Sequence, residues 1–260
     1  YGVDVKHIKR TANVTNIPEL PIEVLNSELK DKIKRDYTTG DPKDTKAKVP
    51  CLSASSINEF INCPLKYYFH HLQHLKNDND VSEFMDSSTF GTIVHDTLQE
   101  CYDPLTAKKE HFRADDIQHF IGKDLNTVLT RNINKTFLYR DDLDAPLTGQ
   151  AVILFETLKR YVLNALHYDK ERIDQHGKIT IVECEVDHRM KLDLGEGTAF
   201  HFTFKADRVE RQGGVLRIID YKTGNDVTSV KEIDNLFTPG KDRAKAVLQL
   251  LLYSVGFYQE

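Results

Sequence analysis

The chain has 260 residues, of which 40% are hydrophobic and 29% are charged, with a formal net charge of −5. This size and composition predict an ordinary soluble core, as one large domain or as a domain with an appendage. No run approaches the roughly 18 apolar residues of a membrane span, so we expect no contact with a membrane. The net charge excludes binding to a polyanion through overall basicity, so such binding needs a local cationic groove.

The four cysteines, Cys51, Cys63, Cys101 and Cys184, form no C-x-x-C pair and have no even spacing. This argues against a disulfide scaffold and fits a reducing compartment, so we expect a cytoplasmic protein. The chain opens with Tyr-Gly-Val and has no signal-like segment. We therefore expect a fragment of a longer protein, truncated at its C-terminus.

The first 50 residues are polar and rich in turn signals, and they predict a linker with one short helix near residues 22–33. A helical part is expected over residues 51–175. Its first helix begins near Leu52, with Ser53 or Ser55 as the cap. Apolar spacing predicts further helices over about 89–102, 113–132 and 148–168.

After residue 175 the apolar pattern changes to a period of two. Strands are predicted over 178–186, 189–194, 200–209 and 215–221, with turns at 196–197 and 212–214 and a last helix over about 243–257. The order predicts an α+β domain over residues 51–260, with its sheet and core in 176–260. The sheet is expected to be small, central and mainly antiparallel, with helices on its sides.

Two carboxylates and a lysine fall on the hairpin predicted over residues 200–221. Asp207 lies on one strand, and Asp220 and Lys222 lie two residues apart at the end of the next strand, so they share a face. Such groups are the minimum set for holding a hard divalent cation beside a phosphate. The structural alternative for an isolated D-x-K is an ion pair at a strand end.

An ordered set of motifs favours the chemical interpretation and resembles the RecB-like and AddB-like branch of the PD-(D/E)XK nuclease superfamily. The resemblance covers about residues 50–260 and implies a restriction-endonuclease-like core. The motifs, in order, are SASS (53–56) leading to CPLKYYF (63–69), FGTIVH (90–95), Glu185, DRVE (207–210), DYKTG (220–224) and QLLLY (249–253).

The resemblance assigns roles to the residues of these motifs. His95, Asp207, Asp220 and the carbonyl of Tyr221 would bind Mg²⁺ or Mn²⁺. Lys222 would activate the attacking water or stabilise developing charge.

The last helix contributes two further predicted residues. Gln249 would donate a hydrogen bond to Lys222 or to the phosphate. Tyr253 lies four residues later on the same face and would contact the DNA backbone. An ordinary amphipathic helix edge is the alternative for this pair.

Two further assignments are less direct. Glu185 matches an acidic family position, although Glu183 and Asp187 share its strand parity. For Arg208 we expect a role in the fold or in DNA contact. The remaining candidate DNA contacts are Lys66, Lys205 and Arg243.

The chain departs from the family pattern at two places. Phe204 stands where the family usually has glycine, three residues before the first aspartate. Cys63 precedes a proline, as the first cysteine of a [4Fe–4S] cluster does in AddB-type proteins, but no C-terminal trio of cysteines follows. A cluster would therefore need a longer parent protein, and here we expect Cys63 to be a buried thiol.

We therefore predict a metal-dependent deoxyribonuclease, an exonuclease on single-stranded DNA ends, working with a helicase region or subunit in DNA repair and recombination. The alternative is a catalytically silent DNA-binding or scaffolding module of the same fold. An RNA-directed nuclease remains open because the motifs do not read the sugar.

Overall fold

The computed structural model describes residues 27–44, 46–47, 49–75, 85–108, 111–193, 195 and 197–259. Residues 1–26 of the predicted linker, which include the start of its predicted helix, lie outside this description. The described part of the linker contains helix α1 (Ser27–Thr38). No helix in the described ranges is long and apolar enough to cross a membrane.

Helix α2 (Ala54–Asn62) begins where reciprocal serine bonds cap it. The Ser53 hydroxyl oxygen accepts a hydrogen bond from the Ser56 amide at 3.1 Å, and the Ser56 hydroxyl accepts one from the Ser53 amide at 2.9 Å. Two amides at the helix start are thereby satisfied. Of the two predicted caps, Ser53 is therefore the one used. A short α3 (Pro64–Tyr67) and a π-helical turn, η1 (Tyr68–Leu72), follow.

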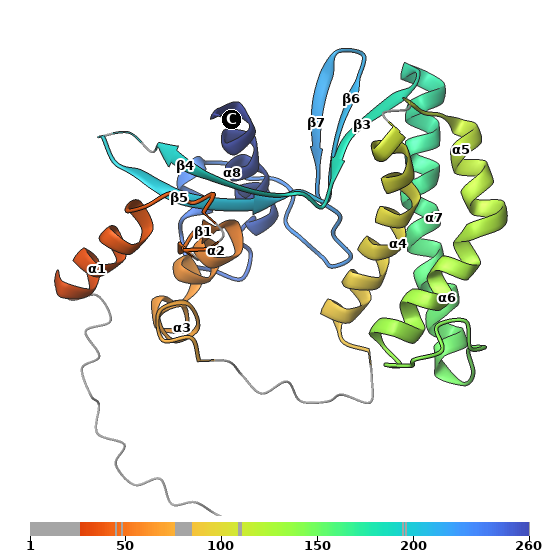
Figure 1. Cartoon of the computed structure of the whole chain (residues 1–260), viewed down its shortest axis with the longest axis horizontal. Coiled ribbons are helices and arrows are strands. Elements are labelled where there is room, and N and C mark those ends of the chain that lie inside the picture. Colours follow the sequence, from red (N-terminus) through yellow and green to blue (C-terminus); the bar gives the residue numbers. More distant parts are fainter. Residues whose placement is uncertain are drawn as a thin grey trace, which may run out of the picture.

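A group of helices forms the larger hydrophobic core. Fully buried side chains from three of its members, among them Ile93, Leu129 and Leu158, fill its centre. Figure 1 shows these helices gathered on one side of the molecule. They are α4 (Ser87–Lys108), α5 (Ala114–His119), the π-helical turn η2 (Phe120–Asp124), α6 (Leu125–Thr136) and α7 (Gln150–His176).

The strands form two sheets, with orders β1-β5-β4 and β2-β3-β6-β7. Every pairing is antiparallel except that of β1 with β5. This arrangement confirms the predicted α+β class with mainly antiparallel strands. The strands are β1 (Leu52–Ser53), β2 (His111–Phe112), β3 (Ile179–Cys184), β4 (Asp187–Asp193), β5 (Ala199–Lys205), β6 (Arg208–Gln212) and β7 (Val215–Ile219). A 3₁₀ turn, η3 (Ile233–Leu236), and helix α8 (Lys245–Gln259) complete the chain.

The prediction of one strand over residues 200–209 is wrong. The chain leaves one sheet after β5 and enters the other at β6. A second break, beside the first, separates β3 from β4. The strand pairing shows where the break lies: Cys184 pairs with Arg208 on one side of it, and Asp187 pairs with Lys205 on the other. Glu185 sits inside it with a φ of 55°. The two strand pairs therefore form one long ribbon that bends between the sheets (Figure 1).

Helix α8 lies very close to β5 at Gly256. A Cβ at this position would overlap the ring of Phe204, which is itself buried. The bulky Phe204, which stands where the family pattern has glycine, is therefore accommodated by a glycine on the facing helix. This contact fixes how near α8 comes to the sheet, and α8 also carries Gln249.

We expect Gly256→Ala to destabilise the protein. Alanine gains about 1 kcal/mol of helix propensity over glycine, but overpacking a tight core costs about 1–3 kcal/mol. The matched control is Gly122→Ala in η2, where nothing lies within 4 Å of an added Cβ. Chemical denaturation should show a loss of stability for Gly256→Ala and none for Gly122→Ala. Equal effects would show that the close approach of α8 is not a constraint.

Candidate metal centre and active site

The hairpin of β6 and β7 brings two aspartates to the same end of one sheet. Arg208, the first residue of β6, pairs with Ile219, the last residue of β7. Asp207 directly precedes this pair and Asp220 directly follows it. The two carboxylates therefore leave neighbouring strands side by side, as the sequence pattern predicts.

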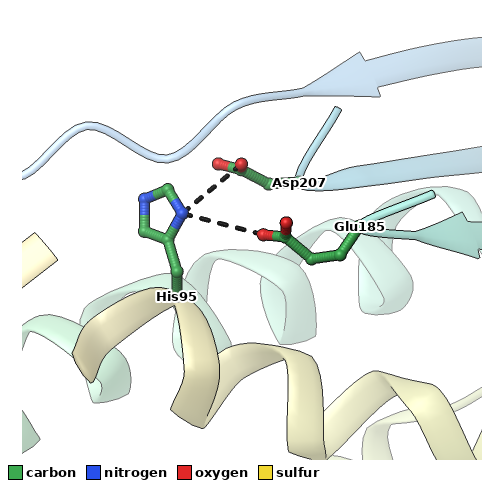
Figure 2. A group of neighbouring side chains, drawn as sticks. All are labelled: His95, Glu185 and Asp207. Atoms are coloured by element: carbon green, nitrogen blue, oxygen red, sulfur yellow. Dashed lines mark ion pairs between the residues drawn. The ribbon is translucent and has the colours of Figure 1, made fainter. Parts of the chain in front are cut away.

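Helix α4 adds His95 to this end of the sheet. Its Nδ1 lies 3.4 Å from Asp207 Oδ1 and 3.8 Å from Glu185 Oε1. Figure 2 shows the imidazole pointing from the helix toward both carboxylates, which come from the bend in the β ribbon. Three elements that are distant in the sequence thus supply one cluster.

The backbone of Tyr221 is held against the same cluster. His95 Nε2 donates a hydrogen bond to the Tyr221 carbonyl oxygen at 2.8 Å. The Tyr221 amide donates to Asp207 Oδ2 at 2.5 Å. Both backbone polar atoms of Tyr221, in the peptide groups before and after its Cα, are therefore held, and its carbonyl oxygen is directed toward His95.

Electrostatics make His95 a cation in the absence of a metal. Burial opposes a charged imidazole, but the carboxylates of Asp207 and Glu185 outweigh it and raise the pKa of His95 to about 10. Burial also acts to raise the pKa of Glu185, but the hydrogen bonds from His95 and Lys205 prevail and lower it. The protonated imidazole thus holds two carboxylates together.

Asp220 and Lys222 form the second half of the site. Asp220 is almost fully buried, and its Oδ2 lies 2.5 Å from Lys222 Nζ, which is partly exposed. Burial and the nearby charge of Asp207 raise the pKa of Asp220, while Lys222 acts to lower it. The lysine is therefore held at the rim of the site by a carboxylate within it.

Gln249 of α8 orients Asp220 and not Lys222. Its side-chain amide donates to Asp220 Oδ1 at 2.8 Å and to the Tyr253 hydroxyl at 2.7 Å. Tyr253 is only 6% exposed and packs in the core beside Phe204. The prediction that Tyr253 contacts the DNA backbone is therefore wrong, because its hydroxyl faces Gln249 inside the protein.

Two of the four candidate DNA contacts are buried: Arg243 is wrong as a DNA contact, and of the two roles expected for Arg208 the one in the fold is observed. Arg208 is 1% exposed and pairs with Asp169 at 2.7 Å, so it supports the fold. Arg243 is 6% exposed, and Nη1 donates to the side-chain oxygen of Asn58 at 2.6 Å and to the Leu236 carbonyl. The partners of these arginines are 39 and 185 residues away in sequence, so no local pattern signals their burial.

The other two predicted DNA contacts lie at the surface but are paired. Lys205 lies 2.5 Å from Glu185, and Lys66 lies 3.1 Å from Glu59, which His70 and His71 also contact.

The contacts also separate Glu185 from Glu183 and Asp187, the two acidic residues that share its position in the strand alternation. Glu183 instead bonds His188 at 2.7 Å, and Asp187 accepts from the Thr203 hydroxyl.

The cysteines divide into exposed and buried positions. All four thiols are free, which agrees with the expected lack of a disulfide scaffold. The prediction that Cys63 is buried is wrong, because Cys63 is exposed between α2 and α3. Its backbone is extended there, between the end of one helix and Pro64 at the start of the next.

The donor set at the bend fits a divalent cation. Ligand atoms of His95, Glu185 and Asp207 all lie within 4.8 Å of one another. Carboxylate oxygens suit Mg²⁺ and Mn²⁺, and an imidazole nitrogen is a ligand of many divalent first-row metals. Within the described residues Asp220 stands outside this group, and its oxygens face Lys222 and Gln249.

We expect the stabilising effect of His95 on the metal-free protein to vanish with rising pH. Its pKa is about 10 when folded and about 6.5 when unfolded, so its contribution is full below pH ~6.5 and is lost as pH rises toward 10. In EDTA, wild type should melt at least ~2 °C above His95→Gln at pH 6, with the gap closing by pH 10. A constant gap would refute the charged pair.

The profile described as the PD-(D/E)XK nuclease superfamily matches residues 51–260, which include both sheets and all residues of the candidate site. A search of curated proteins finds no match. The match spans most of the chain, and the α+β architecture is consistent with a restriction-endonuclease-like fold. The chain belongs to the PD-(D/E)XK nuclease superfamily.

Proposed function

We propose that this chain is a divalent-metal-dependent nuclease that hydrolyses phosphodiester bonds in DNA. The observation that carries the proposal is the cluster of His95, Glu185 and Asp207 beside the Asp220–Lys222 pair. A bound Mg²⁺ or Mn²⁺ would supply Lewis acidity and a nucleophilic water at neutral pH. The donors that would hold it are His95, Glu185 and Asp207, which lie together, with Asp220 and the Tyr221 carbonyl as the further ligands that the family resemblance implies.

The side chains around this centre divide the remaining work. Lys222, with its ammonium group at the rim, is placed to stabilise negative charge on the phosphate oxygens. Asp220 holds Lys222 in place, and Gln249 fixes the carboxylate of Asp220 from the side of α8. His95 gives up its proton when it binds a metal, because only the neutral imidazole is a ligand.

The finer assignment rests on the order of the sequence motifs. We propose an exonuclease of the AddB/RecB type that acts on single-stranded DNA ends, together with a helicase region or subunit, in repair and recombination. The set from SASS (53–56) to QLLLY (249–253) supports this assignment.

We expect Lys222→Ala and Asp220→Asn each to reduce cleavage by about 10²–10³-fold, the usual effect of losing an electrostatic contact in a transition state. Lys191→Ala, an exposed lysine on β4, is the control and should cleave normally. The assay compares end-labelled single-stranded, double-stranded and circular DNA with Mg²⁺, Mn²⁺ or EDTA.

The products of this assay decide between the candidate activities. Mononucleotides from linear DNA alone would support an exonuclease, and cleaved circles would show an endonuclease. Full activity in both variants would refute the assigned site. Absence of cleavage by well-folded wild type with either metal would instead favour the silent DNA-binding module.

Glu185 should affect the metal requirement and not the phosphate contact. We expect Glu185→Gln to raise the Mn²⁺ concentration needed for half-maximal cleavage by about tenfold, because one anionic donor is lost. Asp187→Asn is the matched control, since Asp187 lies two residues away and faces Thr203. Metal titrations of cleavage test this difference. Equal curves for the two variants would remove Glu185 from the metal site.

A further inference from the structure

A buried network of four charges lies behind the candidate site. Arg208 and Arg172 pair with Asp169 at 2.7 and 3.1 Å, and both arginines also contact Glu210. All four side chains are at least nine-tenths buried. The two positive and two negative charges balance, so each charge depends on the others to offset its loss of hydration.

Arg208 touches every element that carries a part of the metal centre. It directly follows Asp207 in sequence and is the strand partner of Cys184, which directly precedes Glu185. Its guanidinium carbon lies 4.2 Å from the centre of the Tyr102 ring and 5.8 Å from the centre of the Tyr221 ring.

Tyr102 connects this arginine to His95. The two residues are seven apart on α4, which is two helical turns, so they lie on the same face. The Tyr102 hydroxyl donates to Asp169 Oδ2 at 2.6 Å. The position of α4 against the sheet, and with it the reach of His95, is therefore set at Tyr102 by the same charges that hold Arg208.

We infer that Arg208 is a positioning residue for the metal centre, which fixes the separation of His95, Asp207, Glu185 and the Tyr221 carbonyl. A shift of the β6 start would leave a buried charge without its partner, which is strongly destabilising, and a shift of α4 would remove the Tyr102 hydroxyl from Asp169. The inference rests on the proposed function, because it concerns the same site.

Arg172 provides a matched control within the same network. It shares Asp169 and Glu210 with Arg208, and it also bonds Gln212 at 3.0 Å. Its ring contact is Tyr168 of its own helix, and these side-chain partners lie on α7 and β6, away from α4 and Tyr221. Arg208→Lys and Arg172→Lys thus make the same chemical change in the same network, once beside the site and once away from it.

The test measures Mn²⁺ binding by titration calorimetry, at a temperature where thermal melts show each protein fully folded. We expect both variants to melt lower than wild type, since lysine loses the planar paired geometry. Arg208→Lys should raise the Kd for Mn²⁺ about tenfold, and Arg172→Lys should leave it within twofold. At saturating Mn²⁺, Arg208→Lys should recover most of its cleavage rate, whereas Lys222→Ala should not.

Each other outcome has a separate meaning. Equal Mn²⁺ affinity in Arg208→Lys and wild type, or an equal loss in both arginine variants, would overturn the positioning role. Failure of wild type itself to bind Mn²⁺ would overturn the proposed function first.

If Arg208→Lys does not fold, Tyr102→Leu replaces it, with Phe112→Leu as control. Both rings are fully buried with centroids 5.1 Å apart, and the Arg208 guanidinium lies 4.2 Å from the centre of the Tyr102 ring. Equal Kd values in that pair would also overturn it.

Discussion

The placement of two carboxylates beside one imidazole is the constraint on which the rest of the structure depends. Like charges so close together are unfavourable unless a cation lies between them. In the metal-free protein His95 is that cation, with a pKa raised to about 10, and Lys205 supports Glu185 from the outside. The helix that carries His95 must therefore stay in register with the strands that carry Glu185 and Asp207.

The bend in the β ribbon is what allows the carboxylates to meet. Regular strands alternate their side chains, so neighbours on a flat ribbon would point to fixed faces. The break after Cys184 and before Arg208 interrupts the alternation, and Glu185 adopts a positive φ that non-glycine residues rarely take. Its amide is held at 3.2 Å by the Ala206 carbonyl across the break. The unusual backbone conformation thus coincides with the site.

The sequence predicted the fold class, because strand and helix periods are local signals, and the resemblance of its ordered motifs to a nuclease superfamily implied that distant residues converge on one site. The break between Lys205 and Arg208 escaped prediction, since the alternation of apolar residues runs on to Ala206; only the next apolar residue, Val209, falls out of phase with it. The burial of Arg208 also escaped, because its partner Asp169 lies on a helix 39 residues earlier. Local patterns can place charged residues on a strand, but only the tertiary structure decides whether those charges face solvent or each other.

The local charge balance explains how a chain with a net charge of −5 can handle a polyanion. At the site, Glu185, Asp207 and Asp220 are formally balanced by Lys205, Lys222 and a protonated His95. Exchange of the imidazole proton for a dication changes this formal sum from zero to +1. The positive charges of Lys205 and Lys222 are then no longer fully offset by the charge of the centre. A bound metal would therefore strengthen the attraction of this site for phosphate.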